Sequence, residues 1–126
     1  MRRLVFLLAA FALMITAGPV AARLPDRADA VAAELAIARQ ALVRGDIEEA
    51  IRLSEGLYRR YPENTRVFWA LVQTYKAADL EEERLAPLLE SQLSRTPDDD
   101  RVMMELGETY ARLAECDRAL ASWLER

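Results

Sequence analysis

The stretch that decides the fold runs from Pro97 to Trp123 and reads P-D-D-D-R-V-M-M-E-L-G-E-T-Y-A-R-L-A-E-C-D-R-A-L-A-S-W. Leu106 and Tyr110 are four residues apart, as are Ala119 and Trp123, so each pair lies on one face of a helix. The glycine after Leu106 has no side chain, which lets a second helix backbone approach closely. This order of apolar, small and aromatic residues predicts two short helices folded face to face.

The same pattern occurs earlier in the chain, so it is a repeat. Five identities recur in register after a shift of 35 residues: Pro62, Arg66, Val67, Leu71 and Tyr75 become Pro97, Arg101, Val102, Leu106 and Tyr110. A more degenerate copy precedes them, with Ile37, Ala38, Ala41, Gly45, Ile47, Ala50 and Pro62. A period in the mid-thirties predicts helix pairs stacked in series.

These residues resemble the tetratricopeptide repeat family, whose unit has the pattern W-x2-L-G-x2-Y, A-x3-F and P. The last unit fills the matching places with Met103, Leu106, Gly107, Tyr110, Ala119 and Trp123. The middle unit departs from the pattern at Val72, which replaces the glycine. The resemblance covers residues 29–126 and implies an all-α fold, a right-handed α-α superhelix of antiparallel helix pairs. It implies two and a half to three repeats, at about 29–63, 64–98 and 99–126, with the last incomplete.

Residues 1–22 have a different character from the rest of the chain. Two arginines precede an uncharged run from Leu4 to Ala17, Gly18 and Pro19 break it, and small residues follow up to Ala22. This order is typical of a secretory signal peptide, and residues 23–28 follow as a linker. The alternative is a retained inner-membrane anchor, but 14 apolar residues are fewer than the roughly 20 that span a bilayer. We therefore expect an exported protein, periplasmic or secreted, that meets the membrane only through an uncleaved leader.

The charge balance narrows the classes of partner. The leader holds two of the 17 basic residues and none of the 21 acidic ones, so the remaining 104 residues carry a net charge of −6. This balance argues against a nucleic-acid-binding or anionic-membrane surface. It is compatible with one small acidic domain that has a modest core.

Local signals place the helix ends. Gly45 suits the left-handed position at a helix C-terminus, and Asp46 caps the next helix. Asn64 or Thr65 caps the helix that follows, up to about residue 78. A proline at position 87 is tolerated only if the fourth helix starts near residues 82–84, which predicts a bent helix or a lengthened turn. The acidic residues at 98–100 precede a helix start, where the helix dipole stabilises negative charge. We therefore prefer this role for them to a metal-binding role.

The inventory of reactive groups is small. The chain has no histidine, and Cys116 is its only cysteine, so an intramolecular disulfide and a thiolate metal cluster are excluded. We expect Cys116 to be a packing residue in the last unit rather than a reactive thiol. No nucleophile elbow, phosphate-binding glycine loop or zinc-binding helix motif occurs. The sequence predicts a protein that is not an enzyme and needs no cofactor or metal.

The family resemblance implies where a partner binds, because the first helix of each unit lines the concave surface. The matched register places a basic set of side chains there: Arg39, Leu42, Arg66, Trp69, Gln73, Lys76, Arg101, Met104, Glu108 and Arg112. Five cations and one acid in a concave surface favour an acidic peptide or a C-terminal carboxylate. In the alternative interpretation the arginines form a solvated helix face and Trp69 packs between units.

Two functions from different classes follow. The first is an exported protein-protein interaction module, a scaffold that binds a protein or peptide in a helical groove. The second is an N-terminal piece of a longer repeat array, because Leu120, Trp123 and Leu124 would remain uncovered and solenoids need a polar terminal cap. That open end would pack on further repeats or on a second copy of the chain.

Overall fold

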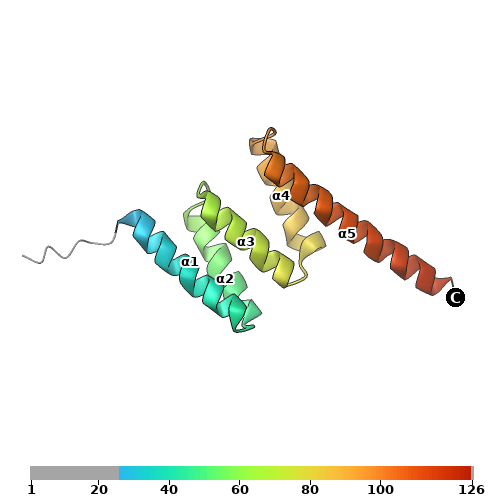
Figure 1. The fold of residues 1–126 in the computed structure, drawn as a ribbon, viewed down its shortest axis with the longest axis horizontal. Coiled ribbons are helices and arrows are strands. Elements are labelled where there is room, and N and C mark those ends of the chain that lie inside the picture. Colours follow the sequence, from blue (N-terminus) through green and yellow to red (C-terminus); the bar gives the residue numbers. More distant parts are fainter. Residues whose placement is uncertain (1–25, 126) are drawn as a thin grey trace, which may run out of the picture.

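The computed structural model describes residues 26–125, and every regular element in this range is helical. Five α-helices and one π-helical turn follow one another, and each packs against its neighbours in the chain (Figure 1). The predicted all-α class is confirmed for these residues. The predicted leader, residues 1–22, and residues 23–25 of the linker lie outside the described range, whereas linker residues 27 and 28 belong to the first helix.

The first two helices form a hairpin. α1 spans Arg27–Val43 and α2 spans Ile47–Arg60. Gly45 lies between them with φ of 79°, the left-handed conformation predicted for it. The Asp46 side chain accepts a hydrogen bond from the Glu49 backbone N–H at 3.4 Å, so it caps α2. Fully buried alanines at 41 and 50 let the two helices pack closely.

α3 spans Thr65–Ala77 and contacts both helices of this hairpin. The Asn64 side chain accepts hydrogen bonds from the backbone N–H groups of Arg66 and Val67, at 3.0 and 3.2 Å, and so caps the helix. α3 is followed by a turn in which Asp79 adopts φ of 55°. Asp79 lies 34 residues after Gly45 and takes the same left-handed turn conformation, because Asp tolerates it better than most residues.

The predicted irregularity before the fourth helix is a π-helical turn. η1 spans Glu81–Leu85 and leads directly into α4, Ala86–Arg95. The Leu85 backbone N–H donates to the Leu80 carbonyl five residues back, at 2.9 Å. A π turn absorbs one extra residue without ending the helix, which accounts for a unit one residue longer than 34. Pro87 is the second residue of α4 and directly follows the π turn, close to the start of the helical segment as predicted.

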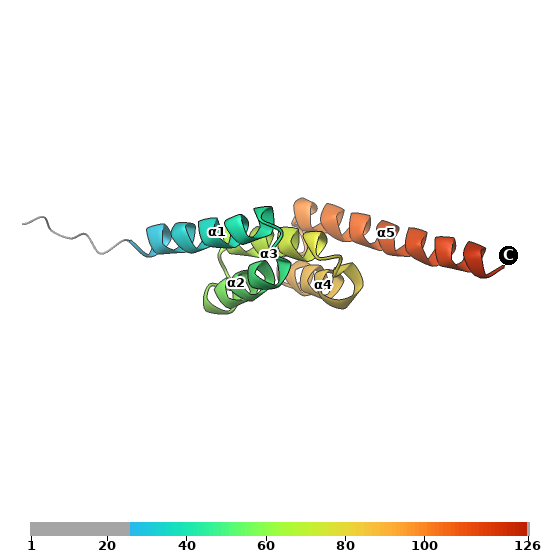
Figure 2. The same cartoon turned by 90° about the horizontal axis from the view of Figure 1, so that it is seen from below.

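The predicted pair of short helices at the end of the chain is wrong. Residues Asp100–Leu124 form one continuous 25-residue helix, α5, capped by Asp99. A third left-handed turn at the same interval would fall on Ala114, which is 35 residues after Asp79. A left-handed backbone is unfavourable for alanine, whose helix propensity is the highest, so the helix continues. The second half of α5 extends past the other helices in both views (Figures 1 and 2).

Two groups of buried apolar side chains hold the helices together. The N-terminal core joins α1, α2 and α3 and consists of Val31, Leu35, Leu57 and Val67. The central core joins α3, η1, α4 and α5 and consists of Phe68, Leu71, Val72, Tyr75, Leu85, Ala86, Leu89, Val102 and Leu106. α3 contributes to both cores, so it connects the two ends of the molecule.

A polar cluster ties α2 to α3 and η1 beside the central core. The Tyr75 hydroxyl donates to Glu55 Oε1 at 2.7 Å, and Arg84 donates to the same oxygen at 2.7 Å. Burial, followed by the hydrogen bond to the Glu55 carboxylate, raises the pKa of Tyr75 above its ordinary value.

The raised pKa of Tyr75 predicts a loss of stability in alkali. Because the folded pKa exceeds the unfolded one, the contribution of this phenol is complete below pH about 10 and declines as pH rises toward the folded pKa. Urea unfolding between pH 8 and 11.5 should show a steeper alkaline decline for the wild type than for Tyr75→Phe. The same substitution at Tyr61, whose hydroxyl forms no hydrogen bond within residues 26–125, is the control, and parallel declines for wild type and Tyr75→Phe would contradict the assignment.

Candidate functional site

The candidate site is an open cavity of about 840 Å³ formed by α1, α3 and the start of α5. Its base is apolar, with Leu35, Ala38 and Ala70, and two buried hydroxyls lie beside them. The Ser54 and Thr74 hydroxyls lie 3.1 Å apart, and Thr74 also donates to the Ala70 carbonyl at 2.8 Å. The cavity is therefore firm at its base and open to solvent above.

Six of the residues predicted for a binding groove line this cavity together. They are Arg39 and Leu42 on α1, Arg66, Trp69 and Gln73 on α3, and Arg101 on α5. None of the described residues that line it is acidic, and none of the three arginines forms an ion pair with a carboxylate of residues 26–125. The structure thus gathers three uncompensated cations around one cavity in an acidic protein.

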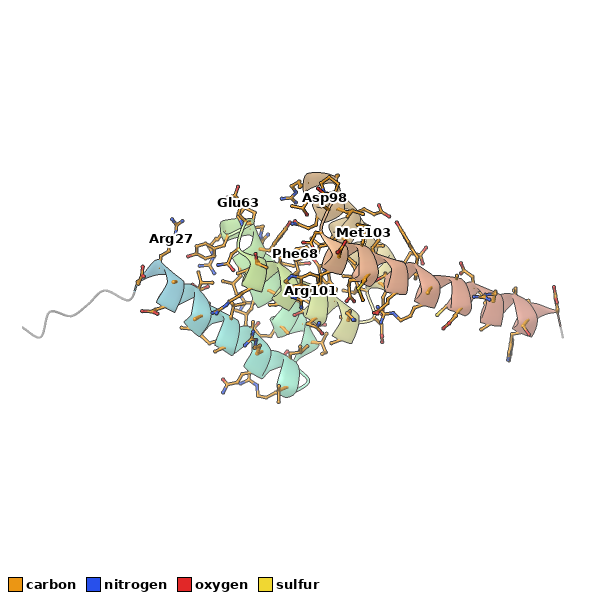
Figure 3. The ribbon with its side chains drawn as sticks, turned by 45° about the horizontal axis from the view of Figure 1, so that its top comes forward. Arg27, Glu63, Phe68, Asp98, Arg101 and Met103 are labelled. Carbon is orange, nitrogen blue, oxygen red and sulfur yellow. The ribbon has the colours of Figure 1, made fainter. Side chains whose placement is uncertain are left out.

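Trp69 and Arg101 contact each other at one side of the cavity. The Arg101 guanidinium carbon lies 3.8 Å from the centroid of the Trp69 ring, within range of a cation–π interaction. Figure 3 shows Arg101 directed from the start of α5 toward α3. The Trp69 ring also meets Phe68 edge-on, with centroids 5.0 Å apart. These contacts fix the orientation of an arginine whose N–H groups remain available to a ligand.

Two predicted groove cations are neutralised instead. Lys76 Nζ lies 2.6 Å from Glu105 Oε1, and Arg112 Nη2 lies 4.0 Å from the same oxygen. Glu105 is largely buried, with 15 % of its side chain exposed, so this ion pair joins α3 to α5. Lys76 and Arg112 do not line the cavity and are removed from the candidate site.

Other predicted residues lie elsewhere on α5. Met104 and Glu108 are exposed and do not line the cavity. Cys116 is exposed, so the expectation of a buried packing role was wrong. The reason is the continuous helix, since Cys116 was expected at a turn where a second helix would cover it. The open-end residues Leu120, Trp123 and Leu124 are 61 %, 79 % and 75 % exposed.

Sequence reasoning missed Glu105, which decides which cations are free. Its position carried a usable signal, because it lies four residues after Arg101 and seven before Arg112 and so shares their helix face. Sequence reasoning also missed the apolar base of the cavity, formed by Leu35, Ala38 and Ala70.

Two further properties concern the described part of the chain. Within residues 26–125, no group of three or more histidine, cysteine, aspartate or glutamate side chains has the geometry to hold a metal ion. The same part of the chain contains no helix with both the length and the apolar character needed to cross a bilayer. The cavity offers guanidinium donors, an amide, a tryptophan ring and an apolar base, which are groups that bind carboxylates beside apolar side chains.

Comparison of the sequence with models of known protein families gave no match. Searches of curated proteins and of solved structures likewise returned no significant relative.

Proposed function

We propose that this chain is a non-catalytic binding module that holds an acidic peptide, or a peptide C-terminus, in the cavity between α1, α3 and α5. The observation that carries the proposal is the set of three arginines around one open cavity without a carboxylate partner in residues 26–125. Like charges held together repel, and an anionic ligand relieves that repulsion while accepting charge-assisted hydrogen bonds.

The neighbouring groups favour a peptide over a simple anion. Trp69 supplies an aromatic surface, Gln73 offers both an amide donor and an acceptor, and Leu35 and Ala70 give an apolar base. An extended peptide has carboxylates, backbone amides and apolar side chains to match each of these groups. Inorganic anions use only the guanidinium groups, so we expect them to bind weakly.

The repeat and export interpretations belong to the same proposal. The left-handed turns at Gly45 and Asp79, and the caps at Asn64 and Asp99, recur at intervals of 34 and 35 residues, which supports tetratricopeptide-like units. We propose that these units form a right-handed superhelical arrangement with the cavity on its concave side. The leader-like residues 1–22 support export to the periplasm or beyond, where the module would act as a scaffold for a protein partner.

Trp69 fluorescence provides a direct test. The chain has two tryptophans, so a Trp123→Phe background leaves Trp69 in the cavity as the sole reporter. A six-residue peptide of alternating Glu and Leu with a free carboxylate should change the emission in a saturable manner. A matched peptide with Gln for Glu and an amidated end should bind at least about tenfold more weakly, because it lacks the charges that the arginines recognise.

The matched variants neutralise equal numbers of arginines. Arg39→Gln/Arg66→Gln/Arg101→Gln should weaken binding of the acidic peptide about tenfold, since each exposed charge pair contributes up to about 1 kcal/mol. The control replaces three exposed arginines outside the cavity, Arg44, Arg59 and Arg118, and should change binding less than twofold. Equal affinity for both peptides, or equal weakening by both triple variants, would refute the proposal.

A further inference from the structure

One face of α5 carries an apolar seam along its whole length. Its positions alternate in steps of four and three residues, the spacing of a heptad repeat: Val102, Leu106, Thr109, Leu113, Cys116, Leu120 and Trp123. The first three positions are buried, and residues of α4 and η1 cover them in the central core. Over this half of the helix, the seam packs as an ordinary interior face.

The second half of the same seam is uncovered. Leu113 is half-buried, Cys116 is exposed, and Leu120 and Trp123 are 61 % and 79 % exposed. Because the steps of four and three continue unchanged, these side chains point in the same direction as the buried half. A contiguous apolar strip on a projecting helix marks an interaction surface.

A hollow of about 740 Å³ lies where the covered and uncovered halves of the seam meet. Leu113, Cys116 and Ala119 of α5 line one side together with Arg112 and Glu115, and Asp79 and the acidic residues Glu81–Glu83 of η1 line the other. The hollow therefore has an apolar strip, with charged side chains at its edge, next to carboxylates that accept hydrogen bonds. A side chain with a large apolar ring and one N–H donor fits both walls.

We propose that a second copy of this chain covers the exposed seam, with the two α5 helices antiparallel about a two-fold axis between Cys116 and Leu120. This register places Leu113 opposite Trp123 of the second copy and Cys116 opposite Leu120 of the second copy. Every exposed seam position then faces an apolar position, as a self-complementary interface requires. The proposal does not rest on the peptide-binding function.

The position of α4 selects the antiparallel orientation. α4 already covers the seam beside Val102 and Leu106. In a parallel pair, both copies of α4 would lie between the two helices at the same level and hold them apart. In an antiparallel pair, the projecting half of one α5 packs on the other α5 next to α4 and in line with it. The remaining helices of the two copies then lie at opposite ends of the pair.

The same register brings Trp123 of each copy to the hollow of the other. Leu113 lines the hollow and is the residue opposite Trp123 of the second copy. The indole ring would contact the apolar strip of the hollow, and its N–H would donate to a carboxylate of Glu81–Glu83. The exposed seam and these contacts amount to roughly 1,000 Å² in total, the lower bound for a specific interface, so we expect a micromolar dimer.

Sedimentation of the purified full chain over a range of concentrations tests the association. The wild type should shift from monomer to dimer in the micromolar range. Leu120→Asp should raise the dissociation constant at least about tenfold, because it buries a carboxylate in the seam. Ser122→Asp is the matched control, since residue 122 points about 200° away from Leu120 around the helix and should leave dimerisation unchanged.

A cysteine pair tests the orientation. In the antiparallel register, Cys116 faces position 120 of the second copy. Leu120→Cys should therefore form a disulfide-linked dimer on oxidation with diamide, which accepts the two protons and two electrons released by each thiol pair. The wild type should stay uncrosslinked, because its two Cys116 residues would be offset by about 6 Å along the axis in addition to the separation between the two helices. Together these place the Cα atoms beyond the roughly 7 Å limit for a disulfide. Ser122→Cys is the matched control and should also stay uncrosslinked.

Each outcome decides the proposal. Crosslinking of Leu120→Cys alone, with dimerisation lost in Leu120→Asp alone, supports the antiparallel pair. Crosslinking of the wild type through Cys116 would indicate a parallel pair and overturn it. A monomer at every concentration, or equal effects of the Leu120 and Ser122 variants, would show that some other chain or further repeats cover this face.

Discussion

Leu89→Ala should lower the free energy of unfolding by about 3 kcal/mol. Leu89 is fully buried in α4 and belongs to the central core that joins α3, η1, α4 and α5. Removing three carbon atoms there costs their transfer free energy and leaves a cavity that the surrounding helices fill only in part. A domain of this size has a total stability of roughly 5–15 kcal/mol, so the loss is a large fraction.

Urea unfolding followed by circular dichroism at 222 nm measures this change directly. The control is Ile37→Ala on α1, where the side chain is 53 % exposed and the expected change is within about 0.5 kcal/mol. If the two variants unfold at the same urea concentration, the packing of α4 against the central core is not as described.

Thr74→Val should cost about 2 kcal/mol, because it leaves a buried polar group without a partner. Thr74 Oγ1 donates to the Ala70 carbonyl, so the Ser54 hydroxyl must be the donor in the bond between the two side chains. Ser54 is 1 % exposed at the base of the cavity. Thr74→Val replaces the acceptor of this hydrogen bond with a methyl group and leaves the Ser54 hydroxyl without a partner.

Ser54 is the donor and Thr74 the acceptor in this hydrogen bond, so the two single substitutions should have unequal effects. Comparing them gives a sharper test than Thr74→Val alone. Ser54→Ala should cost about 1 kcal/mol or less, since Thr74 keeps its bond to the Ala70 carbonyl. The double variant should therefore be more stable than the sum of the single effects predicts, by about 1 kcal/mol. Additive effects in urea unfolding would contradict the direction assigned to this hydrogen bond.

Local chemistry was sufficient to predict the first four helices. Gly45, Asp46 and Asn64 mark helix ends through backbone conformation and capping, which depend on nearby residues only. Pro87 likewise restricts where α4 begins. The length of α5 was mispredicted because the family pattern was extended over Ala114, a residue that does not favour the left-handed turn on which the pattern depends.

The candidate site was predicted in part, and the error has a physical cause. Arg39, Arg66 and Arg101 are brought together as the register implied. The Glu105 carboxylate forms ion pairs with Lys76 and Arg112, and so determines which of the predicted cations remain free. Pairing of this kind is set by the distance between helices that are far apart in sequence, and periodicity within one helix does not give that distance.

The place of α3 in both cores has a consequence for how the protein opens. An amide in α1 or at the far end of α5 exchanges its hydrogen after only a local opening, because each of these segments depends on neighbours at one end of the molecule. The amides around Val67 to Val72 are released only when both cores separate. The slowest-exchanging hydrogens should therefore lie in α3, the helix that lines the candidate-site cavity together with α1 and α5.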